Sequence, residues 1–429
     1  MPTTFLVVSA IGVALALNAR RALRGPILLI PSFFASWLVI ELAPHFLVLH
    51  VAGVGVFVAL GGATSWPGWV ALGLAALNAY LLWSLVSEAW RSHAVFDDAL
   101  TAAIGPASAH RPVVWREFVF PFKLWSRKYK RIRDVPYADP GGRRFRLDIW
   151  QPAEPGEARP CLLYVPGGAW VSLVSNKNHQ AKPLLIEMVA QGWVCFSINY
   201  PLSPRAKFPA HIVAVKRAMA WIREHAHEYG ADPSFVMISG NSAGAHLSSL
   251  AALTPNDSHY QPGFEHADTT VQAAAVFYGV YDFTAAQMDD LRWRSRRHKK
   301  GFIRFLERTV VGRKYGTDAE VFEKASPCHR IGEHAPPFFV IHGAMDTLAL
   351  VEEARAFVER LRAVSNEPVI YAELPRTQHA FDHFLSIRSL YAVRAVARFG
   401  LWAYERYRVS GARRGQPSDR DARSPTSPG

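Results

Sequence analysis

The sequence predicts an α/β protein: a mostly parallel central sheet with helices on both faces, preceded by an N-terminal transmembrane helical region. The first 90 of the 429 residues contain only five charged side chains, whereas residues 141–410 alternate short apolar runs with amphipathic segments. Apolar runs of strand length that alternate with helical patterns are typical of a parallel sheet buried on both faces. The mean hydropathy of +0.04 and the net charge of +13 therefore average two unlike parts.

Residues 1–90 are predicted to form a membrane anchor of about three helices. Met1–Ala19 carries no charge and is followed by a basic cluster of Arg20, Arg21 and Arg24. A cleavable signal peptide would carry its basic residues before the apolar run, so we expect an uncleaved anchor. Two further helices fit at about 27–60, with an interruption near Pro44, and at 69–87, and splitting the former at Glu41 would give four helices in total.

The side of the membrane follows from the basic residues. With three helices, the arginine cluster and the strongly basic region after Glu88 lie on the same side. Because short cytoplasmic segments are enriched in Lys and Arg, this side is expected to be the cytoplasm. A fourth helix would reverse that expectation.

Two basic, aromatic segments together carry a positive charge that is larger than the net charge of the whole chain. Trp115–Arg133 holds seven Lys/Arg against one Glu, with six aromatic residues, and Arg292–Lys314 holds ten against one Glu. Such segments favour anionic lipid headgroups, and we expect them to contact the bilayer, a solvated loop being the alternative. No groove-reading motif or aromatic platform for nucleic acid is present, so nucleic-acid binding is not expected.

The anchor is expected to lead into a basic, aromatic interfacial linker at 91–140 and a catalytic domain at 141–410. Residues 411–429, rich in Ser, Pro, Arg and Asp, are predicted to be a disordered tail. Seven strands are predicted in the catalytic domain, at 144–150, 160–166, 193–200, 235–239, 271–279, 338–343 and 368–374.

A candidate nucleophile follows the strand at 235–239. That strand runs straight into GNSAG, in which Ser242 is the serine of a G-x-S-x-G motif, and a helical segment comes next. Small residues beside the serine allow the sharp strand-to-helix turn that presents its hydroxyl. The motif alone is weak evidence, and the strand–turn–helix context is what supports it.

A serine hydroxyl needs a base and an acid that orients the base, and around this motif both follow the serine in the chain. Asp346 follows the strand at 338–343, and His379 follows the strand at 368–374. Asp282, also at a strand end, is the alternative acid, and Asp346 is favoured by its IHGAMD context. Two other histidines are interpreted as packing or surface residues, His342 inside a strand and His383 beyond His379.

The tetrahedral intermediate also needs amide donors for its oxyanion. The segment PGGAW follows the strand at 160–166, where a glycine-rich loop would approach the nucleophile. The predicted donors are the backbone N–H groups of Gly168, Ala169 and Ala243. A plain turn is the alternative for this segment, and the nearby nucleophile motif favours the oxyanion loop.

These motifs together resemble the hormone-sensitive-lipase-like branch of the α/β-hydrolases. The N-terminal helices resemble those of membrane-anchored esterases and lipases of mycobacteria and related actinobacteria. The similarity covers about residues 141–405 and includes, in order, YVPGGAW, NYPLSP with FPA, ADPSFVMISGNSAGAHL, IHGAMDTL and TQHAF. The resemblance implies an α/β-hydrolase fold and ester hydrolysis, with Ser242, Asp346 and His379 as the triad and Gly168, Ala169 and Ala243 as oxyanion donors.

The chain departs from the family pattern near the expected site. Pro166 stands where the family's loop has histidine, Ala169 replaces the third glycine, and Asn241 replaces an acidic residue before the nucleophile. Alanine keeps its N–H, so the donor count survives, but the loop loses its usual side-chain anchor. The family's tyrosine-arginine-leucine run and a later acidic position are also lost, at Pro201 and Ala214, and we interpret these as one missing ion pair.

We therefore expect a membrane-anchored serine esterase or lipase, in a bacterial cell membrane, that forms an acyl-enzyme from carboxylic esters, lipid esters included. The segment Arg292–Lys314 is predicted to shape a lid that faces the lipid. A non-catalytic binding module of the same fold is the alternative, as are amide hydrolysis and acyl transfer by the same triad. No cofactor or metal is expected, and the cysteines Cys161, Cys195 and Cys328 are interpreted as small buried side chains. The sequence determines neither the oligomeric state nor the acyl chain and alcohol of the substrate.

Overall fold

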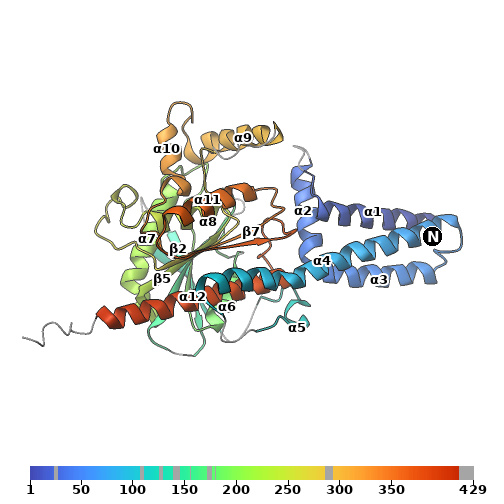
Figure 1. Ribbon diagram of the computed structural model, residues 1–429, viewed down its shortest axis with the longest axis horizontal. Coiled ribbons are helices and arrows are strands. Elements are labelled where there is room, and N and C mark those ends of the chain that lie inside the picture. The colour runs from blue at the N-terminus through green and yellow to red at the C-terminus, as the bar shows by residue number, and fades with distance from the viewer. Residues whose placement is uncertain are drawn as a thin grey trace, which may run out of the picture.

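The computed structural model describes residues 1–23, 28–106, 111–124, 129–138, 145–154, 156–171, 176–178, 180–285 and 293–414, with side chains described up to residue 410 and not for 293–298. In these residues a helical bundle projects from one side of a sheet that is covered by helices (Figure 1).

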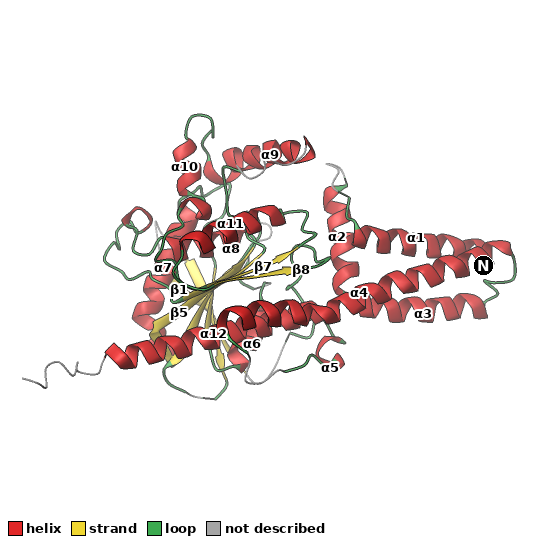
Figure 2. Ribbon diagram, in the orientation of Figure 1, coloured by secondary structure: helices red, strands yellow, loops and turns green. Residues whose placement is uncertain are grey.

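The sheet has eight strands in the order β1-β2-β4-β3-β5-β6-β7-β8, drawn in yellow in Figure 2. The strands are β1 (Tyr129–Ala138), β2 (Phe145–Pro152), β3 (Arg159–Val165), β4 (Val194–Ile198), β5 (Ala231–Asn241), β6 (Ala273–Phe277), β7 (Phe338–Gly343) and β8 (Val369–Leu374). β2 pairs antiparallel with β1 and β4, whereas β4, β3, β5, β6, β7 and β8 run parallel. The predicted mostly parallel α/β sheet is therefore confirmed.

Helices cover both faces of the sheet because its strands are apolar on both faces. Along β3, Leu163 belongs to one core cluster and Leu162 to the other, as expected for side chains that alternate between faces. The first core includes residues of α7 (Ala210–His225), α8 (Ala243–Leu253) and α11 (Val351–Val364). The second includes residues of α6 (Lys182–Ala190) and α12 (Ile387–Arg414).

One strand was not predicted, and it begins in the first basic segment. β1 is the edge strand of the sheet, and its sequence YKRIRDVPYA is too charged to show an apolar run. One of its basic side chains is used inside the protein: Arg131 forms an ion pair with Asp148 at 2.5 Å and lies over the ring of Trp150. The segment Trp115–Arg133 therefore combines the short helix α5 (Trp115–Phe118) and part of a strand, and its residues 125–128 lie outside the described residues.

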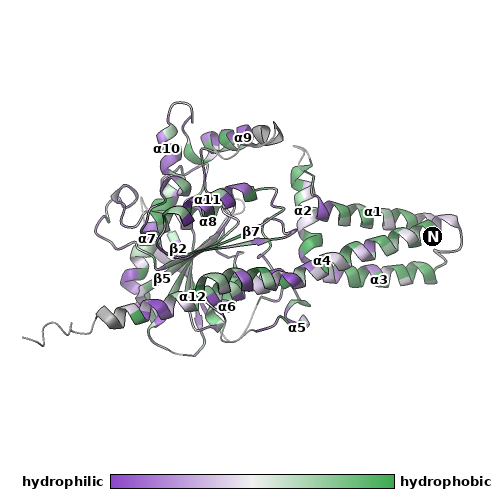
Figure 3. Ribbon diagram, viewed as in Figure 1, coloured by the Kyte–Doolittle hydropathy of each residue, from purple (hydrophilic) through white to green (hydrophobic). Residues whose placement is uncertain are grey.

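In the described residues the N-terminal region forms four helices, coloured mostly as hydrophobic in Figure 3. They are α1 (Pro2–Arg20), α2 (Leu29–Glu41), α3 (Ala43–Ala59) and α4 (Trp66–Ile104). Among the described residues, α1 and α4 are long and apolar enough to cross a membrane, and α2 with α3 is a bent pair that makes a third span if it counts as one.

The second predicted membrane helix, 27–60, is broken by an 85° bend between α2 and α3. Pro44 lies in the first turn of α3, where its missing N–H and its ring prevent α2 from continuing straight into α3. Of these two helices, only α3 runs along the bundle, and α2 lies across the end of the bundle that is next to the sheet (Figure 1). With 17 residues, α3 is about 26 Å long, close to the thickness of a bilayer core.

The predicted boundary at residue 90 falls inside α4. This helix has 39 residues, so it is about 59 Å long and extends well beyond a bilayer core. Its second half carries Ala89, Phe96 and Leu100 into the second core of the sheet. The apolar sequence ends at Glu88, where charged residues begin, but the helix continues. The predicted linker 91–140 thus includes part of α4 and all of β1. At the other end α12 continues to Arg414, so the first four residues of the predicted disordered tail, 411–414, are helical. The rest of that tail lies outside the described residues.

Candidate active site

Ser242 lies at the turn between β5 and α8. Its backbone has φ 52° and ψ −120°, and its N–H donates to the Phe277 carbonyl at 2.9 Å. A Cβ at Gly244 would come within 2.0 Å of the Val165 carbonyl oxygen, and one at Gly240 within 2.6 Å of the Gly244 backbone. Gly240 is thus required by the sharp turn itself and Gly244 by the close approach of β3, which agrees with the G-x-S-x-G interpretation.

His379 and Asp346 meet at the ends of β8 and β7. His379 Nδ1 lies 2.6 Å from Asp346 Oδ2, and both side chains are buried. The other carboxylate oxygen, Oδ1, accepts the backbone N–H groups of Leu348 and Ala349, each at 2.8 Å. Burial alone would raise the pKa of Asp346, but His379 and His342 beside it hold that pKa well below its usual range. The carboxylate is therefore charged and oriented toward His379.

His342 is a buried residue of β7, as the sequence indicated, but it also contacts the acid. Its Nε2 lies 3.0 Å from the Ala349 carbonyl oxygen and 3.4 Å from Asp346 Oδ2. His383 packs against Trp37, with ring centroids 6.1 Å apart and perpendicular planes.

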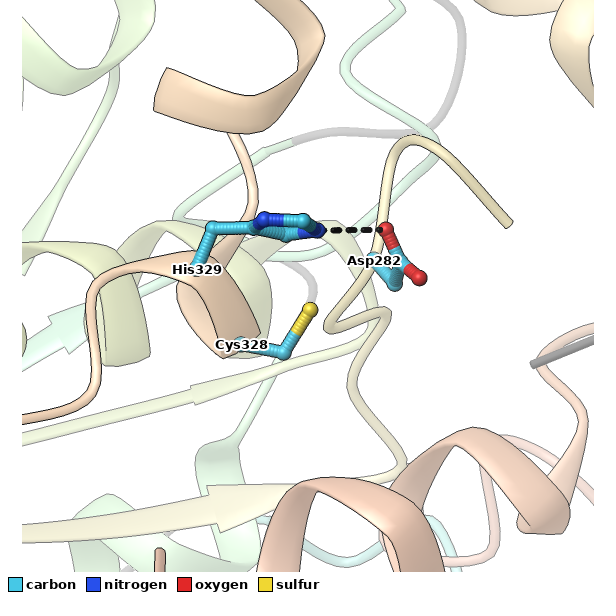
Figure 4. Close-up of side chains that lie close together, drawn as sticks. All are labelled: Asp282, Cys328 and His329. Carbon is cyan, nitrogen blue, oxygen red and sulfur yellow. Dashed lines mark ion pairs between the residues drawn. The ribbon is translucent and has the colours of Figure 1, made fainter. Parts of the chain in front are cut away.

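Asp282, the alternative acid, lies in a different group of side chains (Figure 4). Its Oδ1 accepts from the N–H of Thr284 at 2.8 Å and lies 3.7 Å from Nε2 of His329. Cys328 completes a group whose three ligand-type atoms lie within 4.8 Å of one another. Burial raises the pKa of the Cys328 thiol well above its usual range, which opposes the thiolate that a metal requires. This group is a poor fit for a metal, and Asp346, not Asp282, pairs with His379.

The segment PGGAW lies against Ser242. A Cβ at Gly167 would come within 2.5 Å of the Asn241 carbonyl oxygen and 3.1 Å of Ser242 Cβ. The next three residues, Gly168, Ala169 and Trp170, all have positive φ, at 112°, 51° and 60°. The loop that carries the predicted oxyanion residues Gly168 and Ala169 therefore passes beside the candidate nucleophile at Gly167, and Ala243 follows the nucleophile as the first residue of α8.

Other residues hold this loop where the family's histidine is missing. The Gly167 N–H donates at 2.7 Å to both Gln180 Oε1 and Asn241 Oδ1. The Tyr200 hydroxyl donates to the Pro166 carbonyl at 2.9 Å. The loss of the loop's usual anchor is therefore compensated by side chains that the sequence did not identify.

The end of the loop is held by a buried histidine of α8. Trp170 Nε1 donates to His246 Nδ1 at 3.3 Å, and the imidazole stacks on Phe283 with ring centroids 4.3 Å apart. Burial lowers the pKa of His246 to about 3, so the ring is neutral and its Nδ1 accepts. The sequence feature that could have identified His246 as a site residue was its position four residues after Ser242.

Tyr278 is a second site residue that sequence reasoning missed. Its ring centroid lies 4.4 Å from that of His379. Its hydroxyl accepts from Asn241 Nδ2 at 3.0 Å and donates to Asp382. It follows β6 directly, and parallel strand ends meet at one edge of the sheet, which places it in the site.

The BD-FAE family profile matches residues 147–361, half of the chain. The chain belongs to the BD-FAE family. This BD-FAE member is 42% identical over 410 residues to the probable carboxylic ester hydrolase LipM of Mycobacterium tuberculosis, a match that covers 92% of each chain. It is 48% identical over 268 residues to Esterase LipQ of the same organism, which is 62% of this chain and 61% of LipQ.

Solved structures agree with the fold of this BD-FAE member. The butyrate-bound esterase of the planctomycete Thermogutta terrifontis superposes with a TM-score of 0.51 at 22% identity and covers 62% of this chain and 92% of its own. The sarin-phosphonylated esterase 2 of that organism superposes with a TM-score of 0.52, also at 22% identity, and covers 62% and 93%. The protein has the α/β-hydrolase fold and is a carboxylic ester hydrolase, as the sequence predicted, and not a non-catalytic module.

Proposed function

We propose that this esterase is anchored in a membrane and hydrolyses carboxylic esters, lipid esters included, with Ser242 as the nucleophile and His379 and Asp346 as base and acid. The observation that carries the proposal is the buried pair of His379 and Asp346, 2.6 Å apart, in a protein whose strand-to-helix turn holds a serine with strained backbone angles.

Each residue has one role in this mechanism. Nε2 of His379 takes the proton of Ser242 Oγ as that oxygen attacks the ester carbonyl carbon, and then gives the proton to the departing alcohol. Water repeats the two steps on the acyl-enzyme and releases the acid. Asp346 keeps the other imidazole nitrogen, Nδ1, protonated and oriented. The N–H groups of Gly168, Ala169 and Ala243 would stabilise the oxyanion of each tetrahedral intermediate.

Membrane anchoring is supported by the apolar outer surface of the bundle. Side chains of α1, α3 and α4 such as Ile11, Val48 and Trp83 are exposed, which is unfavourable in water over such an area. At the junction of bundle and hydrolase, Trp115, Phe120 and Phe122 are also exposed, beside the basic residues of the first segment. Aromatic and basic side chains at this level are typical of the headgroup region.

The proposed orientation follows the direction of the helices. The N-terminus lies at the end of the bundle far from the sheet (Figure 1), so α1, α3 and α4 cross in turn. Three crossings leave Arg20, Arg21 and the hydrolase on one side, which the positive-inside rule assigns to the cytoplasm.

The test of the proposed chemistry uses the full-length protein in detergent micelles with p-nitrophenyl esters of increasing chain length and a fluorophosphonate probe. Ser242→Ala is expected to abolish turnover and labelling. Asp346→Asn should lower kcat about 10⁴-fold because the imidazole loses its tautomer. Asp282→Asn is the matched control and should keep most of the activity. Labelling of Ser242→Ala at the wild-type rate would refute the assignment.

A further inference from the structure

We propose that α2 is a positioning element of the active site, which aligns His379 through the Gln378 side chain and the Ala380 carbonyl. The inference rests on the proposed role of His379 as the general base. It assigns to an apolar helix of the N-terminal region a part in catalysis that neither the family match nor the sequence motifs include.

The Gln378 side chain joins three parts of the site. Its Oε1 accepts the N–H of Thr347 at 2.8 Å and the N–H of His379 at 3.1 Å. Its Nε2 donates to Ser36 Oγ on α2 at 3.2 Å, and both side chains are fully buried. The loop after Asp346, the loop of His379 and α2 are therefore held by one amide group.

A second contact acts on the residue after His379. Trp37 Nε1 donates to the Ala380 carbonyl at 2.9 Å, and Ala380 has φ 62°, an angle that costs a non-glycine residue about 1–2 kcal/mol. On the same face of α2, the buried ring of Phe33 packs edge-on against His379, with centroids 6.4 Å apart. The backbone of the histidine loop is thus supported on both sides of His379 by α2.

A buried ion pair fixes the end of the helix. Glu41 accepts from the Ser386 hydroxyl at 2.6 Å, and Arg388 lies 3.8 Å from its other carboxylate oxygen. Arg388 also donates to the Ile40 carbonyl at 3.3 Å. A buried pair of this kind is a weak source of stability but specifies one arrangement, since displacing either partner leaves a buried charge unpaired.

The opposite face of α2 is apolar and exposed. Ile30, Phe34 and Leu38 lie one helical turn apart and are 36–52% exposed, and α2 carries no charged residue before Glu41. If the bundle is embedded as proposed, this face meets lipid while the other contacts the histidine loop. One helix therefore separates the bilayer from the general base, and the docking of α2 determines whether His379 is aligned.

The decisive experiment measures kcat and KM of the full-length protein in micelles with p-nitrophenyl acetate, a soluble ester that needs no delivery from a bilayer. The variants are Ser36→Ala, Gln378→Ala, the double variant and Trp37→Phe. Ser32→Ala is the matched control, because Ser32 is also buried on α2 but donates to Asn18 within the N-terminal helices at 2.6 Å. End-point fluorophosphonate labelling counts the active sites, so misfolded protein does not lower kcat.

Ser36→Ala and Trp37→Phe should each lower kcat per active site about two- to tenfold, the effect of one hydrogen bond, with KM unchanged. The double variant should match Gln378→Ala, since Ser36 acts through that amide. Wild-type kcat in both Ser36→Ala and Trp37→Phe, or an equal loss in Ser32→Ala, would overturn the positioning role. Turnover that survives Ser242→Ala would instead overturn the proposed function itself.

Discussion

At the scale of single residues, the contacts of Asn241 explain why an amide stands beside the nucleophile where an acidic residue was expected. Its Oδ1 accepts from the Gly167 N–H, and its Nδ2 donates to the Tyr278 hydroxyl. The hydroxyl proton of Tyr278 is already donated to Asp382, so the neighbouring side chain must be a donor there. An amide provides both a donor and an acceptor, and a carboxylate provides only acceptors.

Glu353 is a buried carboxyl group whose protonation should make stability depend on pH. Burial, with Asp282 nearby, raises its pKa to about 8, from an ordinary value of 4.5. The unfolded chain releases this proton near pH 4.5 and the folded chain retains it until about pH 8. The free energy of unfolding therefore falls as pH rises through this window, by about 1.4 kcal/mol per unit.

Glu353→Gln should remove that fall. Thermal denaturation of the variant and the wild type at pH 6.5 and pH 8 measures it, because the buried His211 and His246 affect stability only below pH 6.5. The wild type is expected to lose about 2 kcal/mol between these values and the variant much less. Glu352→Gln, one residue away and partly exposed, is the control and should behave as the wild type. An unchanged pH dependence in Glu353→Gln would contradict the prediction.

At the scale of elements, α4 belongs to two environments. Its first half packs along α1 and exposes Tyr80 and Trp83, whereas its second half buries Phe96 and Leu100 in the second core of the sheet. The N-terminal bundle and the hydrolase are therefore joined through a shared helix and not through a flexible linker.

Phe96→Ala should destabilise the hydrolase by about 3–5 kcal/mol, since it leaves a cavity in a core that the sheet itself lines. The midpoint of urea denaturation, followed by esterase activity in micelles, measures the loss. Trp83→Ala, on the exposed first half of the same helix, is the control and should leave the midpoint unchanged. Equal midpoints for Phe96→Ala and the wild type would show that α4 contributes nothing to the hydrolase core.

At the scale of the whole molecule, basic residues of the second basic segment surround a cavity. α9 (Trp293–Phe305) extends toward α2 (Figure 1). A cavity of about 760 Å³ is bordered by α9, by the π-helical turn Leu306–Val311 and by the residues after that turn. That cavity is lined by Lys299, Lys300, Ile303, Arg304, Glu307, Arg308, Gly312, Arg313, Lys314 and Tyr315. All of these residues except Tyr315 belong to the predicted lid segment, and none of the proposed catalytic side chains is among them.

Replacing Lys300, Arg304 and Lys314 with glutamine should lower activity on esters in anionic vesicles about tenfold or more, since each basic residue contributes about 1 kcal/mol at such a surface. Activity on soluble p-nitrophenyl acetate should not change. The difference should shrink at high salt, where these charges are screened. Equal losses on vesicles and on the soluble ester would contradict a lipid-facing role. Lys324→Gln, on α10 (Ala319–Lys324), is the control.

The amino-acid sequence was enough to predict the fold class, seven of the eight strands in the described residues and the chain order of the proposed catalytic groups. These features are local: an apolar run predicts a strand, and G-x-S-x-G predicts the turn that its own glycines make possible. Asp346 and His379 could be proposed as a pair because they follow strands whose ends meet at one edge of a parallel sheet, and the structure brings their side chains together.

The surroundings of these groups depend on tertiary packing, which the sequence pattern does not show. The choice of Asp346 over Asp282, the contacts of Tyr278 and His246, and the docking of α2 all join residues from separate parts of the chain. An edge strand such as β1 escaped detection because its one-sided burial leaves no continuous apolar run. An apolar helix has the same sequence pattern whether lipid or protein covers it, so only the packing of α2 revealed that one of its faces contacts the histidine loop.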